Sequence, residues 1–152
     1  MADVPFLTSI DEHRVVKAIQ RAEKATTGEI RVHIEGRCRR EPLEQAKEVF
    51  ARLGMHRTQL RNGILLYIAH KDRKAAIIGD QGIAEKVGDG FWESEFATLR
   101  EHFKRGDYAG GIEQVVGDMG AKLREFFPGD GLDATENPDE LSNQVSYGED
   151  KS

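Results

Sequence analysis

Two short apolar runs, at residues 64–68 and 75–78, lie at the centre of the chain. Both are rich in β-branched or aromatic residues and are bounded by Gly, Asn or Asp, a pattern typical of buried strands rather than helices. The charged break between them, residues 70–74, is too short for a parallel crossover. The pattern therefore predicts an antiparallel hairpin.

One more strand, the first in chain order, is predicted at residues 29–34, where apolar and polar residues alternate strictly. Ile30, Val32 and Ile34 fall on one face of this strand, and Glu29, Arg31 and His33 fall on the other. Such alternation is typical of a strand that is covered on one face only.

Helical spacing of apolar residues predicts four helices, at residues 9–26, 42–53, 91–106 and 108–126. Their ends carry the expected signals. Ser9 with Glu12 forms a capping box, Pro42 occupies a first helical position, and Asp107 caps the last helix.

The order of these elements fixes the predicted topology. The helix at 42–53 connects the first strand to the second, and so long a connection implies a right-handed parallel crossover. The third strand then returns antiparallel, which gives an α/β domain with a small mixed sheet. We expect one domain over residues 1–128, followed at residues 129–152 by an acidic tail with few large apolar residues, typical of disorder.

Charge is unevenly distributed along the chain. The net charge is -5, but residues 129–152 hold seven acidic residues against one lysine, so the remainder is close to neutral. A neutral body argues against a nucleic-acid-binding protein that relies on a basic face. The single cysteine excludes an internal disulfide, and the apolar patch at residues 4–7 is too short for a signal peptide or a membrane span. We therefore expect a cytoplasmic protein.

Candidate chemistry follows from the topology. Because the third predicted strand runs opposite to the other two, its end at Asp80 should lie beside the beginnings of the others, at Glu29 and Asn62. Asp89, before the helix at 91–106, can reach the same place. Carboxylate and amide oxygens without cysteine suit Ca²⁺ or Mg²⁺ rather than zinc. Each residue also has a purely structural interpretation: a solvated strand end for Glu29, turns for Asn62 and Asp80, and a helix cap for Asp89.

Two arginines precede the second predicted strand. Arg57 and Arg61 can hold a phosphate group by bidentate hydrogen bonds, although most arginines at such positions are simply exposed to solvent. This leaves two functional hypotheses. The first is a divalent-cation-binding domain with a structural or adaptor role, whose protein partner the sequence does not identify. The second is a metal-dependent phosphomonoesterase.

The chain also resembles the TPM domain family. The resemblance rests on five segments in order, TGEI at 27–30, RNGILLYIA at 61–69, IIGDQGI at 77–83, GDGFW at 88–92 and DYAGGI at 107–112, and covers roughly residues 8–127. It implies a three-layer α/β/α sandwich with helices on both faces, divalent cation binding and, by analogy with plant members, weak acid phosphatase activity. Where many relatives have Gly-Tyr-Gly after the third strand, this chain has Gly79-Asp80-Gln81-Gly82, so its ligand set can differ.

Overall fold

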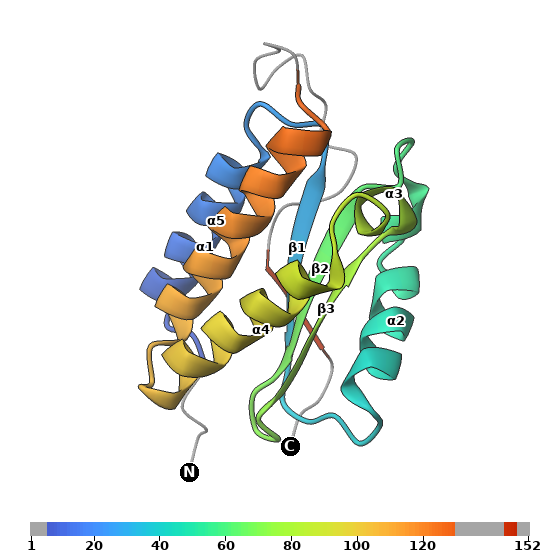
Figure 1. The fold of residues 1–152 in the computed structure, drawn as a ribbon. Coiled ribbons are helices and arrows are strands. Elements are labelled where there is room, and N and C mark those ends of the chain that lie inside the picture. The colour runs from blue at the N-terminus through green and yellow to red at the C-terminus, as the bar shows by residue number, and fades with distance from the viewer. Residues whose placement is uncertain (1–5, 130–144, 149–152) are drawn as a thin grey trace.

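The computed structural model describes residues 6–129 and 145–148, which form a four-stranded sheet with helices on both faces (Figure 1). The helices are α1 (Ser9–Glu23), α2 (Pro42–Arg52), α3 (Gln81–Ala84), α4 (Asp89–Lys104) and α5 (Tyr108–Phe126). A short 3-10 helix, η1 (Met55–Arg57), lies between α2 and the second strand. The strands are β1 (Glu29–Glu35), β2 (Gly63–Ala69), β3 (Lys74–Gly79) and β4 (Ser146–Tyr147).

The strand order is β3-β2-β1-β4, and the sheet is mixed. β1 is parallel to β2, with α2 in the connection between them, and β2 is antiparallel to β3. The predicted crossover, hairpin and mixed sheet are therefore confirmed. Together with helices on both faces of the sheet, they make the fold the expected three-layer α/β/α sandwich.

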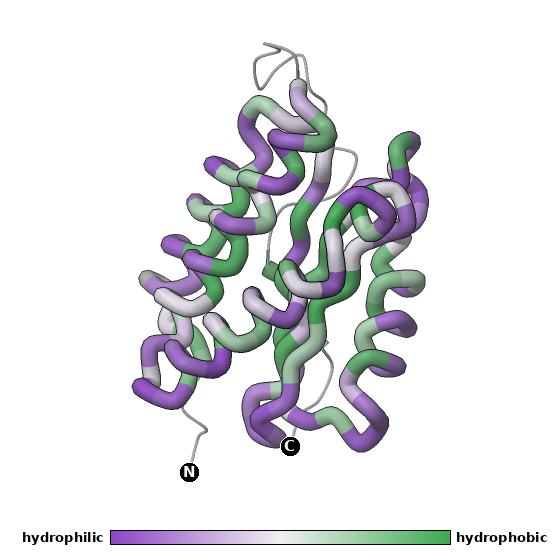
Figure 2. Tube along the Cα trace, viewed as in Figure 1, coloured by the Kyte–Doolittle hydropathy of each residue, from purple (hydrophilic) through white to green (hydrophobic). Residues whose placement is uncertain are grey.

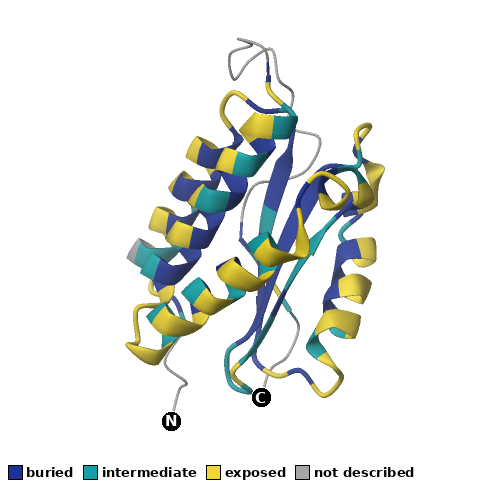
Figure 3. Cartoon of the chain, in the orientation of Figure 1, coloured by how far each residue is buried: buried dark blue, intermediate teal, exposed yellow. Residues whose placement is uncertain are grey.

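Apolar side chains fill both interfaces of the sandwich. Side chains of β1 and β2 such as Val32 and Leu66 pack against α1, α4 and α5, whereas Leu65 and Tyr67 of β2 pack against α2. Figures 2 and 3 show the consequence: β2 is apolar and buried, β3 beside it is mostly half-buried, and polar residues cover the outer faces of the helices. Burial of β2 on both faces explains its uninterrupted apolar run.

The prediction that β1 is covered on one face only is wrong. Glu29 and His33, assigned to the solvated face, are 4% and 2% exposed. That face is covered by α2 and by the C-terminal segment: Gln45 Nε2 of α2 donates to Glu35 Oε2 over 3.0 Å, and His33 Nδ1 lies 2.8 Å from Ser146 Oγ. The alternation of β1 reflects a buried polar network rather than exposure to water.

Within the predicted tail the structure describes Gly129 and the four residues 145–148, and the latter join the sheet. β4 pairs in parallel with His33 and Ile34 of β1, and the backbone N–H of Gly148 donates to the Ile34 carbonyl over 2.8 Å. The expectation of a disordered tail beyond residue 128 is wrong for these four residues. Residues 130–144 and 149–152 lie outside the described range.

Two of the three helix-end signals given for Ser9, Pro42 and Asp107 are confirmed. Asp107 caps α5 by accepting a hydrogen bond from the Gly110 N–H, and Pro42 is the first residue of α2. The cap of α1 is Thr8, whose hydroxyl accepts from the Asp11 N–H, so the predicted capping box of Ser9 is wrong. None of the helices among the described residues is both long and apolar enough to cross a bilayer.

Candidate functional site

Strand register brings three predicted site residues to one end of the sheet. Glu29 pairs with Gly63, and Ile64 pairs with Gly79. Asn62 directly precedes Gly63, and the backbone N–H of Asp80 donates to the Gly63 carbonyl over 2.8 Å. We call this place, where β1 and β2 begin and β3 ends, the β1–β2–β3 end. The backbones of residues 29, 62 and 80 converge there because β3 runs antiparallel to its neighbours.

All three side chains are withdrawn from solvent at this end. Glu29, Asn62 and Asp80 are 4%, 1% and 6% exposed. Burying a carboxylate is costly unless it is paired or bound to a cation, so solvation does not explain these residues. The interpretation of Glu29 as a solvated strand end is therefore wrong.

Asn62 is held by two neighbouring hydroxyl groups. Its backbone N–H donates to Thr58 Oγ1 over 3.3 Å, and its side-chain Nδ2 donates to Thr27 Oγ1 over 3.2 Å. Its Oδ1 atom is buried and accepts no hydrogen bond among the described residues. Most buried polar atoms in proteins have a partner, and turn chemistry does not explain why the amide oxygen of Asn62 has none among the described residues.

Asp80 makes two kinds of contact. Arg61 holds its carboxylate in a bidentate pair, with Nε to Oδ2 at 2.7 Å and Nη2 to Oδ1 at 2.9 Å. Oδ1 also accepts the Gln81 N–H over 2.8 Å, which makes Asp80 the N-cap of α3. The hydrogen bond to Asp80 raises the pKa of the Arg61 guanidinium. Asp80 therefore has a structural role in pairing and capping, whatever else it binds.

The glycine after Gln81 is explained by a close backbone contact. A Cβ at Gly82 would lie 2.1 Å from the Leu60 carbonyl oxygen, and the Gly82 N–H donates to the Arg61 carbonyl over 2.8 Å. Arg61 itself has a positive φ of 53°. This tight approach of α3 to the segment before β2 positions Arg61 and Asp80 for their ion pair.

A shallow groove of about 400 Å³ adjoins the Arg61–Asp80 pair. His56 and Lys47 also line it, and sequence reasoning missed both. Lys47 lies on α2, and its only sequence signal is a place on the polar face of that helix. Arg57 is exposed at the end of η1 and is not among the residues that line the groove.

Asp89, the fourth predicted ligand, is the first residue of α4. It is exposed in the first turn of α4, whose N-cap is Gly88, so its interpretation as the helix cap is wrong. None of the hydrogen bonds or ion pairs described within residues 6–129 joins Asp89 to Glu29, Asn62 or Asp80.

The donor set of the β1–β2–β3 end fits a hard cation in its chemistry. It contains two buried carboxylates and one amide oxygen, all oxygen donors of the kind Ca²⁺ and Mg²⁺ prefer. Within the described residues, however, no group of three or more His, Cys, Asp and Glu side chains is placed to hold a metal ion. Asn62 would have to supply the third protein ligand, and Arg61 already neutralises Asp80.

Comparison with known proteins agrees with the α/β/α sandwich fold described above. The family profile described as the TPM domain matches residues 2–122, which is most of the chain, so the protein belongs to the TPM domain family. The resemblance seen in the sequence is thereby confirmed. No curated protein matches the chain.

Several solved structures share the fold. The BA42 protein from the psychrophilic bacterium Bizionia argentinensis is 37% identical, covers 97% of this chain and 100% of its own, and gives a TM-score of 0.85. The N-terminal domain of the cg2496 protein from Corynebacterium glutamicum gives 0.62 at 15% identity, over 81% of this chain and 86% of its own. The N-terminal domain of a P. gingivalis protein gives 0.63 at 17% identity, over 79% and 78%. The last two show the fold alone.

Proposed function

We propose that the β1–β2–β3 end binds a divalent cation, Ca²⁺ or Mg²⁺, through oxygens of Glu29, Asn62 and Asp80. In this proposal the domain has a structural or adaptor role. The supporting observation is the buried Oδ1 of Asn62, which accepts no hydrogen bond among the described residues and lies beside two chain positions that carry buried carboxylates. When bound, the cation would supply positive charge that offsets the cost of burying those carboxylates.

In this proposal Arg61 competes with the bound cation for the carboxylate of Asp80. Its guanidinium already holds both carboxylate oxygens of Asp80, at 2.7 and 2.9 Å. A bound ion must therefore displace Arg61 or share Asp80 with it. Because the Arg61 side chain is 42% exposed whereas that of Asp80 is 6% exposed, Arg61 is the partner that can swing away into solvent.

The experiment measures the melting temperature with EDTA, Ca²⁺ and Mg²⁺ for the wild type and three variants. An ion that binds only the folded state raises the free energy of unfolding by about 2.7 kcal/mol when its concentration is a hundred times Kd. We expect Asp80→Asn to lose the ion-induced shift. Arg61→Gln should lower the melting temperature in EDTA, because Asp80 is left buried and unpaired, but should enlarge the shift. Arg57→Gln, an exposed arginine three residues after Gly54, is the matched control.

Each outcome bears on the proposal. If neither ion shifts the melting temperature of the wild type, the cation site does not exist. If the ion still shifts Asp80→Asn as it shifts the wild type, the site lies elsewhere on the chain. Asp89→Asn then tests the remaining predicted ligand, since its effect on the shift is independent of the Arg61–Asp80 pair.

The alternative function, a metal-dependent phosphomonoesterase, would use the groove beside Arg61 and Asp80. Arg61 already directs two N–H groups at Asp80, and Arg57 does not line the groove. The cation-binding role therefore requires less rearrangement. Hydrolysis of p-nitrophenyl phosphate that requires the ion and is abolished by Asp80→Asn, but not by Arg57→Gln, would favour the enzyme instead.

A further inference from the structure

A second cavity lies at the other end of the sheet, where β2 leads into β3. Its volume is about 720 Å³, within the range of small-molecule sites. It is bounded by the β2–β3 hairpin, the C-terminal half of α4 and the beginning of α5. β2 spans Gly63–Ala69, so at about 3.3 Å per residue roughly 20 Å separates this cavity from Asn62. Neither function proposed above uses it.

The cavity has an aromatic wall drawn from three separate parts of the chain. Phe6 stacks on His70 of the hairpin, with ring centroids 4.9 Å apart and planes inclined by 21°. The Phe6 ring also contacts Tyr108 at 4.6 Å and Phe103 at 5.8 Å. These rings present flat apolar surface, which suits a ligand that has a ring system of its own.

The charged residues that line the cavity are all basic. None of the lining residues is acidic, and the arginines and lysines among them are Arg73, Lys74, Arg100, Lys104 and Arg105. This is a local excess of positive charge in a chain whose net charge is -5. The carboxyl end of α4 contributes about half a negative charge, which the basic side chains outweigh. A cavity lined by one sign of charge concentrates ligands of the opposite sign.

Arg73 and Arg100 are the basic groups most available to a ligand. Neither enters an ion pair among the described residues, whereas Lys104 lies 3.7 Å from Glu101 and the Lys74 ammonium donates to the Cys38 carbonyl. The Arg100 guanidinium lies 5.1 Å from the centre of the Phe96 ring, which also lines the cavity. A cation held against an aromatic ring is ready to pair with an anion without losing its packing.

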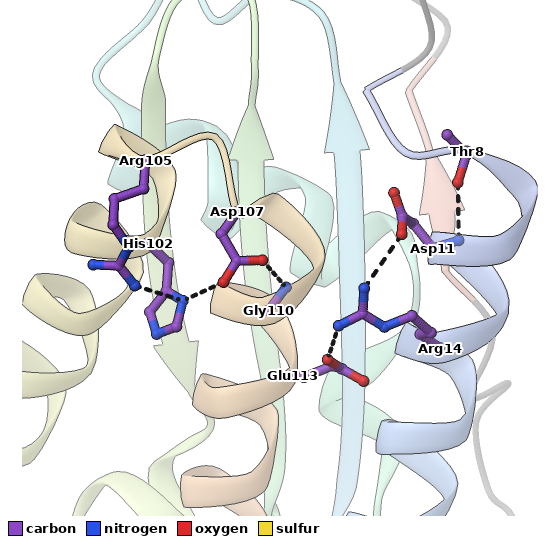
Figure 4. A network of polar contacts seen from close by, with 8 residues as sticks. All are labelled: Thr8, Asp11, Arg14, His102, Arg105, Asp107, Gly110 and Glu113. Atoms are coloured by element: carbon purple, nitrogen blue, oxygen red, sulfur yellow. Dashed lines mark hydrogen bonds and ion pairs between the residues drawn. The ribbon is translucent and has the colours of Figure 1, made fainter.

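The wall at the corner between α4 and α5 is fixed by hydrogen bonds (Figure 4). Asp107 accepts from the Gly110 N–H over 3.2 Å and from His102 Nδ1 over 2.9 Å, and the hydrogen bond from His102 lowers the pKa of Asp107. Arg105 lies against the same imidazole. The corner that carries Arg105 and Tyr108 is thus held in place before any ligand arrives.

We infer that this cavity, between the β2–β3 hairpin and the C-terminal half of α4, binds a small aromatic anion. The ligand would have a flat ring body against Phe6 and Tyr108 and a sulfonate, phosphate or carboxylate group paired with Arg73 and Arg100. The partly open shape and the volume of about 720 Å³ suit a small molecule that enters from solvent.

The test uses two probes that differ in charge. One is 8-anilinonaphthalene-1-sulfonate, and the other is N-phenyl-1-naphthylamine, which has the same ring body without the sulfonate. Fluorescence titration of the full chain should show one saturable site for the sulfonate. In the double variant Arg73→Gln/Arg100→Gln its affinity should fall by about tenfold or more, since each lost contact is a hydrogen bond to a charged group. The affinity for the uncharged probe should change by less than about twofold.

Controls separate the cavity from general surface binding. Arg21→Gln removes an exposed arginine of α1 that does not line the cavity and should bind both probes like the wild type. Ala75→Trp, on the β3 wall, should block both probes by filling the space. The inference is overturned if the sulfonate does not saturate, if the double arginine variant binds it as tightly as Arg21→Gln, or if the uncharged probe weakens equally. The arginine variants decide the matter even if Ala75→Trp does not fold.

Discussion

The carboxyl group of Glu95 makes the stability of this protein depend on pH in a direction that can be worked out. Glu95 lies on α4 with 5% of its surface exposed, and it interacts with Asp118 of α5. Burial, together with the hydrogen bond to Asp118, raises the pKa of Glu95 from 4.5 to about 8. At neutral pH Glu95 is therefore mostly protonated, and its carboxyl group can donate a hydrogen bond to Asp118.

The sign follows from proton uptake. Between pH 4.5 and about 8 the folded protein holds a proton on Glu95 that the unfolded chain has lost, so stability falls as pH rises through this window. Below pH 4.5 the stabilising contribution of the protonated Glu95 carboxyl group is fully present. Each pKa unit corresponds to about 1.4 kcal/mol, which sets an upper limit on the order of 5 kcal/mol. We expect about 2–4 kcal/mol of this limit, because relaxation and water penetration around a newly ionised group reduce the cost of burying its charge.

The variant Glu95→Gln keeps the size and the donor but removes the titration. At pH 5 its free energy of unfolding should match that of the wild type within about 0.5 kcal/mol. At pH 9 it should exceed the wild type by about 2–4 kcal/mol, which raises the melting temperature on the order of 5–15 °C. Urea unfolding across this pH range measures the difference directly.

The matched control is Glu93→Gln, which removes an exposed carboxylate from the same helix. Its difference from the wild type should be small and nearly independent of pH. A Glu95→Gln advantage of equal size at pH 5 and pH 9 would refute the reasoning, because an effect that does not vary with pH cannot come from a titrating group.

Two further predictions concern the packing of α5 on α1 and a buried hydrogen bond of β2. Gly117→Ala should stabilise the protein by about 0.5–1 kcal/mol, because a Cβ at this position of α5 meets nothing within 4 Å. Gly120→Ala should destabilise it by about 1–3 kcal/mol, because its Cβ would lie 2.9 Å from the Cα of Ala22. Thermal unfolding compares the two variants, and equal effects would contradict the close packing of α1 on α5. Tyr67→Phe should lower the free energy of unfolding in urea by about 1–3 kcal/mol, because the Tyr67 hydroxyl donates to the buried Glu35 Oε2 at 2.5 Å and its removal takes one donor from that oxygen. An unchanged midpoint would mean that this hydrogen bond adds no stability beyond the bond that Gln45 Nε2 already donates to the same oxygen.

Most of the fold could be predicted from the sequence because its signals are local or topological. The length of the connection through α2 dictated the parallel pairing of β1 with β2, and the short charged break dictated the hairpin. What could not be predicted is the cover on the second face of β1. Glu35 and His33 are buried there by Gln45 of α2 and Ser146 of β4, and a strand of two residues has too little periodicity to be recognised.

The candidate site, too, has one part that could be predicted from the sequence and one part that could not. The meeting of residues 29, 62 and 80 follows from strand direction alone, and the sequence predicted it. The bidentate pairing of Arg61 with Asp80 depends on the positive φ of Arg61 and on the close approach of Gly82 to the Leu60 carbonyl. Neither has a periodic signal, which is why the sequence indicated Arg61 as a phosphate ligand and not as the partner of Asp80.

The two ends of β2 lie beside sites of opposite charge preference, one suited to a cation and the other to an anion. Asn62, before the strand, belongs to a group of buried oxygens, whereas the cavity beyond Ala69 is basic. Because β2 is buried along its whole length, a shift of the strand would disturb its packing on both faces of the sheet. Sites separated by this distance with no shared partner behave additively. Saturation with Ca²⁺ or Mg²⁺ should therefore leave the affinity for the aromatic sulfonate unchanged, and a change in that affinity would require a coupled movement of the sheet.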